Sequence, residues 1–141
     1  MFVTAFFGIL DPATGRLRYC NAGHNPPLVL AGGQFARLTR TGIALGVLDQ
    51  PGYHQAEVTV DPAGYLCLYT DGVTESFRDG VIAYGEEGLT ALLRRTEGNS
   101  CQEMLELLLE DLNNFTGGIP LRDDISVVLL RREPEGDTTA G

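Results

Sequence analysis

The sequence predicts an α+β protein in which helices pack on antiparallel β-sheets. Short apolar or alternating segments, separated by Gly and Pro turns, fill the first two thirds of the chain. A helical period appears only after residue 85, and one more apolar segment follows at residues 125–130. Strands, then helices, then a strand is an order typical of helices that cover antiparallel sheets.

The first two strands are expected to form a hairpin. Residues 1–10 are apolar and rich in β-formers, so we expect a buried strand there. Pro12 and Gly15 mark a turn, because Pro fixes φ and Gly permits a positive φ. Residues 16–20 alternate polar and apolar side chains, which is the period of a half-buried strand.

A second hairpin is expected around Gly32-Gly33, which separates residues 28–30 from residues 35–38. Two consecutive glycines suit a type I′ turn, because both of its central residues need a positive φ. Two further strands are predicted from alternation and from an apolar run, at residues 53–60 and 65–69.

Two helices are expected in the last third of the chain. Leucines at helical spacing predict a short helix after Gly85 that ends near Gly98. Ser100 and Glu103 form the pattern of a capping box and predict the start of a second helix. Its apolar stripe is Met104, Leu105, Leu108, Leu109, Leu112 and Phe115. The nearly continuous apolar run at residues 125–130 then predicts a central strand.

Composition excludes several classes of protein. The chain has 141 residues, of which 43% are hydrophobic and 21% charged, as in a soluble globular domain. We expect one domain over residues 1–132, a disordered tail over 133–141, and a cytoplasmic location. The net charge of −9 comes from 19 acidic and 10 basic residues, all of the latter Arg. An acidic protein disfavours contact with nucleic acid or with anionic membranes, and it is compatible with a cation site.

The cysteines do not indicate a metal or redox motif. Cys20, Cys67 and Cys101 are far apart and odd in number, and no CxxC pair occurs. We expect buried free thiols in a reducing compartment.

Acidic residues border two apolar strands. Asp71 follows the strand at residues 65–69, and Asp123-Asp124 precede the strand at residues 125–130. If the two strands are antiparallel neighbours, these carboxylates converge on one rim of the sheet and need a compensating charge. A hard cation such as Mg²⁺ or Mn²⁺ supplies that charge, and Gly72 would allow a close backbone approach. Alternatively, Asp71-Gly72 is a hairpin turn and the Asp pair ends a connection.

Residues 21–27 cannot be regular structure, because Gly23, Pro26 and Pro27 interrupt them. The first four, Asn21 to His24, form a further candidate loop at the rim. On the functional interpretation, His24 or the backbone N–H groups of the loop position an anionic substrate. On the alternative, which the local sequence favours, Asn21 tolerates a left-handed backbone in a turn and His24 is simply solvated.

The ordered set of these motifs resembles one family. The segments are residues 1–4, 21–28, 42–46, 68–75 and 123–127. Together they resemble the SpoIIE/RsbU branch of the bacterial PPM (PP2C-like) serine/threonine phosphatases. The resemblance implies an α-β-β-α sandwich of antiparallel sheets covered by helices. It also implies two Mn²⁺ or Mg²⁺ ions at one edge.

The resemblance also implies roles for individual residues. Asp71 and Asp123 match metal-binding residues that serve catalysis, with Gly72 beside them, and Asp124 is either a ligand of a further ion or lies behind the ligands. The loop with Asn21 and His24 matches a stretch near the catalytic rim. The implied reaction is attack of a metal-activated water on the phosphorus. The implied substrate is a phosphorylated STAS-type anti-sigma-factor antagonist.

One departure from the family pattern stands out. The family's first metal motif, D-x-x-G-x-G, is absent from the sequence. We therefore expect the fold to be incomplete at its N-terminus and the chain alone to be inactive. An uncovered sheet face and edge would then favour aggregation or a homodimer. The alternatives are a catalytically silent protein-binding module in a sigma-factor cascade and a β-rich domain without metal.

Overall fold

The computed structural model describes residues 1–134. These residues fall into two compact units, which are described separately. The first unit comprises residues 1–66 together with the described residues from 132 onward, and the second comprises residues 67–131. The predicted disordered tail at 133–141 lies outside the described residues from position 135.

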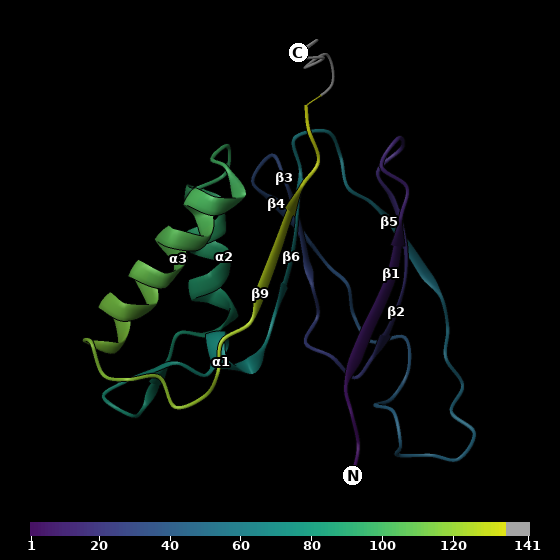
Figure 1. The fold of residues 1–141 in the computed structure, drawn as a ribbon, viewed down its shortest axis with the longest axis horizontal. Helices are drawn as coiled ribbons and strands as arrows, with labels where there is room; N and C mark the ends of the chain where they lie inside the picture. Colours follow the sequence, from purple (N-terminus) through teal and green to yellow (C-terminus); the bar gives the residue numbers. More distant parts are fainter. Residues whose placement is uncertain (135–141) are drawn as a thin grey trace. The chain divides into compact units, whose positions relative to one another are not determined.

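The first unit contains a three-stranded antiparallel sheet in the order β1-β2-β5 (Figure 1). The strands are β1 (Ala5–Leu10), β2 (Arg16–Ala22) and β5 (Ala56–Thr59). On the inner face of β2, Leu17 and Tyr19 are buried, and Phe6 of β1 stacks on Tyr19 with ring centroids 5.6 Å apart. The predicted first hairpin is thus confirmed.

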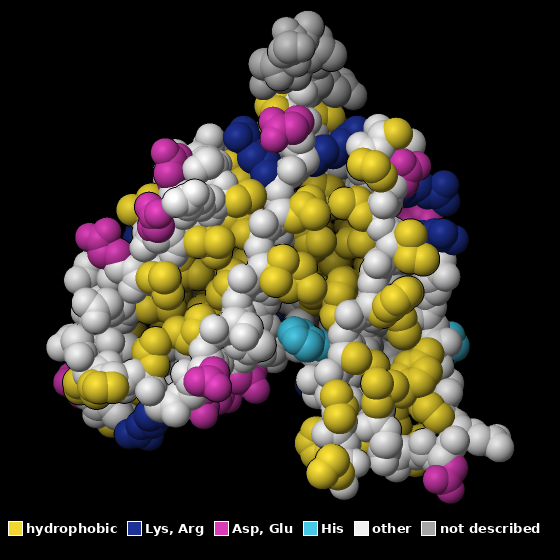
Figure 2. Space-filling view, viewed as in Figure 1, with side chains coloured by type: hydrophobic (Ala, Val, Ile, Leu, Met, Phe, Trp, Pro, Cys, Tyr) yellow, Lys and Arg dark blue, Asp and Glu magenta, His cyan; other side chains and the backbone are white. Residues whose placement is uncertain are grey.

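The prediction that residues 1–10 form a buried strand is wrong. The side chains of Phe2, Phe7 and Ile9 are 66%, 67% and 52% exposed. Within the described residues β1 is an edge strand that pairs with β2, and the face that carries Phe7 and Ile9 points away from Leu17 and Tyr19. Figure 2 shows hydrophobic side chains along this strand.

The second predicted hairpin is confirmed. It consists of β3 (Leu28–Ala31) and β4 (Gln34–Arg37), which pair antiparallel. Gly32 and Gly33 have φ angles of 56° and 74°, the two positive values that a type I′ turn requires. Leu28, Val29 and Leu30 are all buried, so both faces of β3 are covered.

The second unit begins within strand β6 (Tyr65–Tyr69). It contains all of the helices in the described residues (Figure 1). Its elements are α1 (Asp71–Thr74), β7 (Phe77–Arg78), β8 (Ile82–Ala83), α2 (Gly85–Arg95), α3 (Cys101–Thr116) and β9 (Val127–Arg131). The buried core of α2 and α3 consists of Leu89, Leu92, Leu93, Met104, Leu108 and Leu112, all at the predicted helical spacing.

Helix α3 begins with the predicted capping box. The Ser100 hydroxyl accepts from the Glu103 N–H at 3.2 Å, and the Glu103 carboxylate accepts from the Ser100 N–H at 3.1 Å. The helix is followed by Gly117 in a left-handed conformation with φ 69°. Asp111 on the same helix accepts from the Tyr84 hydroxyl at 2.7 Å and from Arg95 at 2.8 Å, which connects α3 with α2 and the residue before it.

The prediction of a central strand at residues 125–130 is wrong. The apolar run at residues 125–130 was expected to form a central strand, but among the described strands β9 lies at the edge of its sheet, beside β6. Val128 is accordingly 62% exposed. An apolar run predicts two covered faces, yet it cannot show whether a further strand pairs with the outer edge. None of the helices in residues 1–134 is both long and apolar enough to span a membrane.

Candidate functional site

The structure places Asp71 directly after β6, at the start of a short helix. Thr70 precedes it with extended backbone angles, φ −105° and ψ 168°, and Asp71 is the first residue of α1. The alternative interpretation of Asp71-Gly72 as a hairpin turn is therefore wrong. The Asp-Gly pair that does form such a turn is Asp79-Gly80, between β7 and β8, with φ angles of 54° and 68°. Sequence reasoning missed this hairpin although its dipeptide is the standard signal.

The end of β6 and the start of β9 lie side by side. The Thr70 N–H donates to the Ser126 carbonyl at 3.1 Å, and the Ser126 N–H donates to the Thr70 hydroxyl at 3.1 Å. Thr70 directly follows β6 and Ser126 directly precedes β9. The two segments that carry the candidate acidic residues are thus joined by hydrogen bonds, as expected for antiparallel neighbours.

Gly72 brings the two acidic segments into direct backbone contact. A Cβ atom on Gly72 would lie 3.0 Å from the carbonyl carbon of Asp124 and closer still to its oxygen. Only a residue without a side chain allows this approach. The Gly72 carbonyl also accepts from the Ser76 hydroxyl at 2.8 Å, which fixes the turn of helix that follows Asp71.

The three candidate carboxylates are on the surface of the second unit. Asp71, Asp123 and Asp124 are exposed. Within residues 1–134, neither Asp123 nor Asp124 has a hydrogen bond or ion pair from its side chain. The ligand atoms that these three side chains offer to a metal ion are carboxylate oxygens, which suit a hard cation. The described chain contains no group of three or more His, Cys, Asp or Glu residues that could hold a metal ion. The acidic rim therefore offers part of a ligand set.

Asn21 lies in β2 of the first unit, so the predictions that it lies outside regular structure and adopts a left-handed backbone are wrong; the left-handed residue is Gly23, with φ 75°. His24 lies in the loop that follows, and Asn21 has a structural role. Asn21 is completely buried, its side-chain amide donates to the Leu38 carbonyl at 2.9 Å, and its side-chain oxygen accepts from the His24 N–H at 2.8 Å. The Asn21 N–H donates to the Thr41 hydroxyl at 2.8 Å. The His24 ring is partly exposed and Nδ1 lies 3.0 Å from the Asn25 carbonyl. Substrate contact by either residue stays a prediction, and the burial of Asn21 speaks against it.

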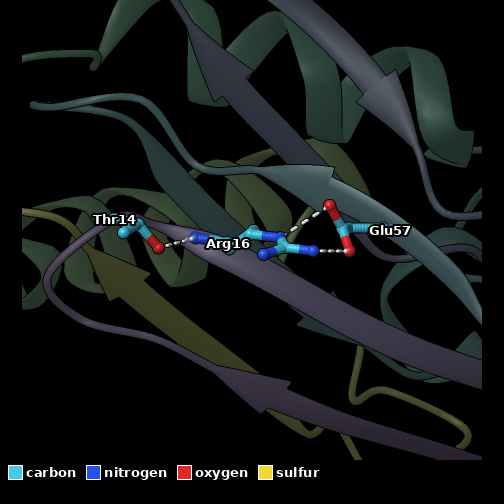
Figure 3. Close-up of polar contacts among 3 residues, drawn as sticks. All are labelled: Thr14, Arg16 and Glu57. Carbon is cyan, nitrogen blue, oxygen red and sulfur yellow. Dashed lines mark hydrogen bonds and ion pairs between the residues drawn. The ribbon is translucent and has the colours of Figure 1, made fainter.

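The charged pair on the outer face of the first unit is a structural contact between strands. Arg16 of β2 binds Glu57 of β5 through two hydrogen bonds of 2.8 and 2.9 Å, and its N–H donates to the Thr14 hydroxyl at 3.2 Å (Figure 3). The hydrogen bond from Arg16 lowers the pKa of Glu57. Because the two charges satisfy one another, this pair is not a candidate binding site.

Two further titratable groups are inert rather than reactive. Burial raises the pKa of the Cys67 thiol to about 12, so this residue stays protonated at neutral pH. Burial, and then the hydrogen bond to Asp111, raise the pKa of Tyr84. All three cysteines are free, as predicted, but only Cys67 is fully buried.

Residues 1–133 match the protein family described as Stage II sporulation protein E (SpoIIE). The chain belongs to the SpoIIE family. It is 32% identical over 133 residues to protein IcfG of Synechocystis sp., covering 94% of this chain and 21% of that protein. It is 26% identical over 135 residues to phosphoserine phosphatase RsbU of Bacillus subtilis, covering 94% of this chain and 40% of that protein.

Among solved structures, the SiaA-PP2C domain of Pseudomonas aeruginosa is similar with a TM-score of 0.78 and 24% identity, over 91% of this chain and 51% of that one. This similarity confirms the PP2C-like α+β fold class. The chain thus spans between about a fifth and about half of the length of these three relatives.

Proposed function

We propose that this SpoIIE-family chain forms part of a metal-dependent phosphatase domain that removes phosphate from phosphoserine or phosphothreonine on a regulatory protein. The observation that carries the proposal is the contact of Gly72 with the Asp124 backbone, next to the Thr70–Ser126 hydrogen bonds. It supports a shared position for Asp71 and Asp123, the two residues that match the family's metal-binding residues. Family membership supports the type of reaction.

In this proposal Asp71 and Asp123 hold a divalent cation, Mn²⁺ or Mg²⁺, with Asp124 as a further ligand or as support behind the ligands. Oxygen donors on an exposed rim fit such an ion, because Mg²⁺ keeps several of its waters and takes only one or two protein carboxylates. When bound, the ion supplies activation of water and charge stabilisation at the phosphoryl group. Gly72 sets the spacing of the two carboxylate segments, and Thr70 and Ser126 fix their register.

The proposed substrate is a phosphorylated STAS-type antagonist of an anti-sigma factor. The similarity to RsbU, which is named a phosphoserine phosphatase, supports a phosphoserine on a regulatory protein as the target. A catalytically silent binding module is the second candidate. It is favoured by the absence of a three-residue metal-binding group from the described chain.

A turnover assay with p-nitrophenyl phosphate and Mn²⁺ separates the two candidates. Turnover that is lost in Asp71→Asn and in Asp123→Asn, but kept in the exposed control Asp49→Asn, supports the phosphatase and refutes the expectation that the chain alone is inactive. Absence of turnover in a longer protein that also carries the D-x-x-G-x-G motif, with the phosphoprotein still bound, favours the binding module. Turnover that persists in both Asp71→Asn and Asp123→Asn would exclude the proposed site.

A further inference from the structure

A small cavity of about 70 Å³ adjoins the acidic rim in the second unit. It lies between the β7–β8 hairpin and the loop that follows α3, and its lining includes Glu75, Ser76, Phe77 and Arg122. Two residues of the lining are linked to the segments that carry Asp71 and Asp123. Ser76 donates to the Gly72 carbonyl at 2.8 Å, and Arg122 directly precedes Asp123. Whatever enters this cavity therefore sits next to the segments that carry Asp71 and Asp123.

Arg122 is the basic residue in the lining of this cavity, and it is exposed. Its guanidinium lies over the hairpin turn, 3.8 Å from the position of a Cβ atom on Gly80. It has no hydrogen bond or ion pair to any of residues 1–134, and this includes Glu75, the other charged residue of the lining. By contrast, Arg95 binds Asp111 and Arg78 lies over the Phe115 ring, so the neighbouring arginines have partners.

The surroundings of Arg122 are apolar and exposed. The lining includes Ile119 and Leu121, whose side chains are 59% and 41% exposed. A guanidinium beside apolar surface suits a carboxylate on a partner protein, because contact with the apolar residues removes water from the charge pair. A cavity of about 70 Å³ has room for the end of one side chain.

We propose that Arg122 binds an acidic side chain that neighbours the phosphorylated residue of the partner protein. Arg122 is thus a specificity-determining residue, and this inference rests on the proposed phosphatase function. Glu75 opposes a second acidic group in the cavity, which restricts recognition to one carboxylate at a time. The apolar residues of the lining contact the partner on either side of that carboxylate.

The test is fluorescence anisotropy with labelled phosphoserine peptides in EDTA. Two peptides differ only in carrying Glu or Gln beside the phosphoserine. The unchanged chain should bind the Glu peptide about fivefold more tightly, in the range of a partly desolvated charge pair. Arg122→Gln should remove this preference and Arg122→Glu should reverse it. The matched control is Arg40→Gln, an exposed arginine of the first unit, which should keep the preference.

Several results would overturn the inference. One is that the unchanged chain binds both peptides with equal affinity. Another is that Arg122→Gln and Arg40→Gln change the preference for the Glu peptide equally. A third is that Arg122→Gln weakens binding through a lost contact with the phosphate and not with the Glu side chain. Binding of neither peptide also counts against it. Because EDTA removes divalent ions, this test is independent of the metal site, whose failure would appear in the turnover assay instead.

Discussion

Replacing Gly72 with alanine tests the junction that brings the acidic segments together. The added methyl group would lie 3.0 Å from the Asp124 carbonyl carbon, 3.4 Å from the Ile125 Cα and inside contact distance of the Asp124 oxygen. All three atoms belong to the backbone, so no side chain can rotate out of the way. Restoring ordinary contact distances requires a shift of the Asp124 segment by about 1 Å. Overpacking of this kind costs about 1–3 kcal/mol.

The assay is urea unfolding followed by circular dichroism, with Gly52→Ala as the matched control. Gly52 has open space around its Cβ position and no positive φ, so alanine there should leave the free energy of unfolding unchanged within about 0.5 kcal/mol. The reasoning is refuted if the two variants have the same stability. A Gly72→Ala variant with an unchanged free energy of unfolding would mean that the two acidic segments can move apart without loss of stability.

Three other predictions concern the helices and the buried groups. Ser100→Ala removes the hydroxyl that accepts from the Glu103 N–H and should lower the free energy of unfolding by about 1 kcal/mol in urea, whereas an unchanged midpoint would show that the cap is dispensable. Tyr84→Phe removes the 2.7 Å hydrogen bond to Asp111 and should cost about 1 kcal/mol by the same measurement; no loss would show that Arg95 alone satisfies that carboxylate. Burial raises the pKa of Cys67 from 9.0 to about 12, so the folded state holds this proton more tightly than the unfolded state. Its stabilising effect is present below pH 9 and is lost as pH rises towards 12, at about 1.4 kcal/mol per pH unit. Stability measured between pH 9 and 11 should fall less steeply in Cys67→Ala, and identical slopes would contradict this account.

Local structure could be predicted where a few neighbouring residues determine it. Gly32-Gly33 dictates its turn because almost no other residue adopts two positive φ angles in succession. Ser100 and Glu103 define the start of α3 because the hydrogen bonds of the cap are local. The convergence of the Asp71 and Asp123 segments was also predictable, since antiparallel strands place the end of one beside the start of the other.

Burial of the outer strands was not predictable from local pattern. Residues 1–10 and 125–130 are apolar on both faces, which indicates covered strands, yet β1 and β9 are edge strands among the described elements. Whether the face or edge of a strand is covered depends on segments remote in sequence, which a local sequence pattern does not reveal. The role of Asn21 was missed for a related reason, because its partners Leu38 and Thr41 lie in a different segment of the chain.

The β7–β8 hairpin is the element that a closer reading of the sequence could have found. Asp79-Gly80 is a standard turn dipeptide in a connection of three residues, but the strands on either side are only two residues long and show no alternation. The neighbouring Asp71-Gly72 has the same letters and opens a helix instead, because Thr70 is held by Ser126 and the chain after it turns into α1. Tertiary hydrogen bonds decide between the two outcomes.

The central claim is that Asp71 and Asp123 hold one divalent cation between them. Isothermal titration of the chain with Mn²⁺ tests it most directly, using Asp71→Asn, Asp123→Asn and the double variant. We expect each single variant to lose about tenfold or more in affinity and the double variant to lose little beyond that, because removing either ligand breaks the same site. Affinity for Mn²⁺ that is the same in all four proteins would contradict the account.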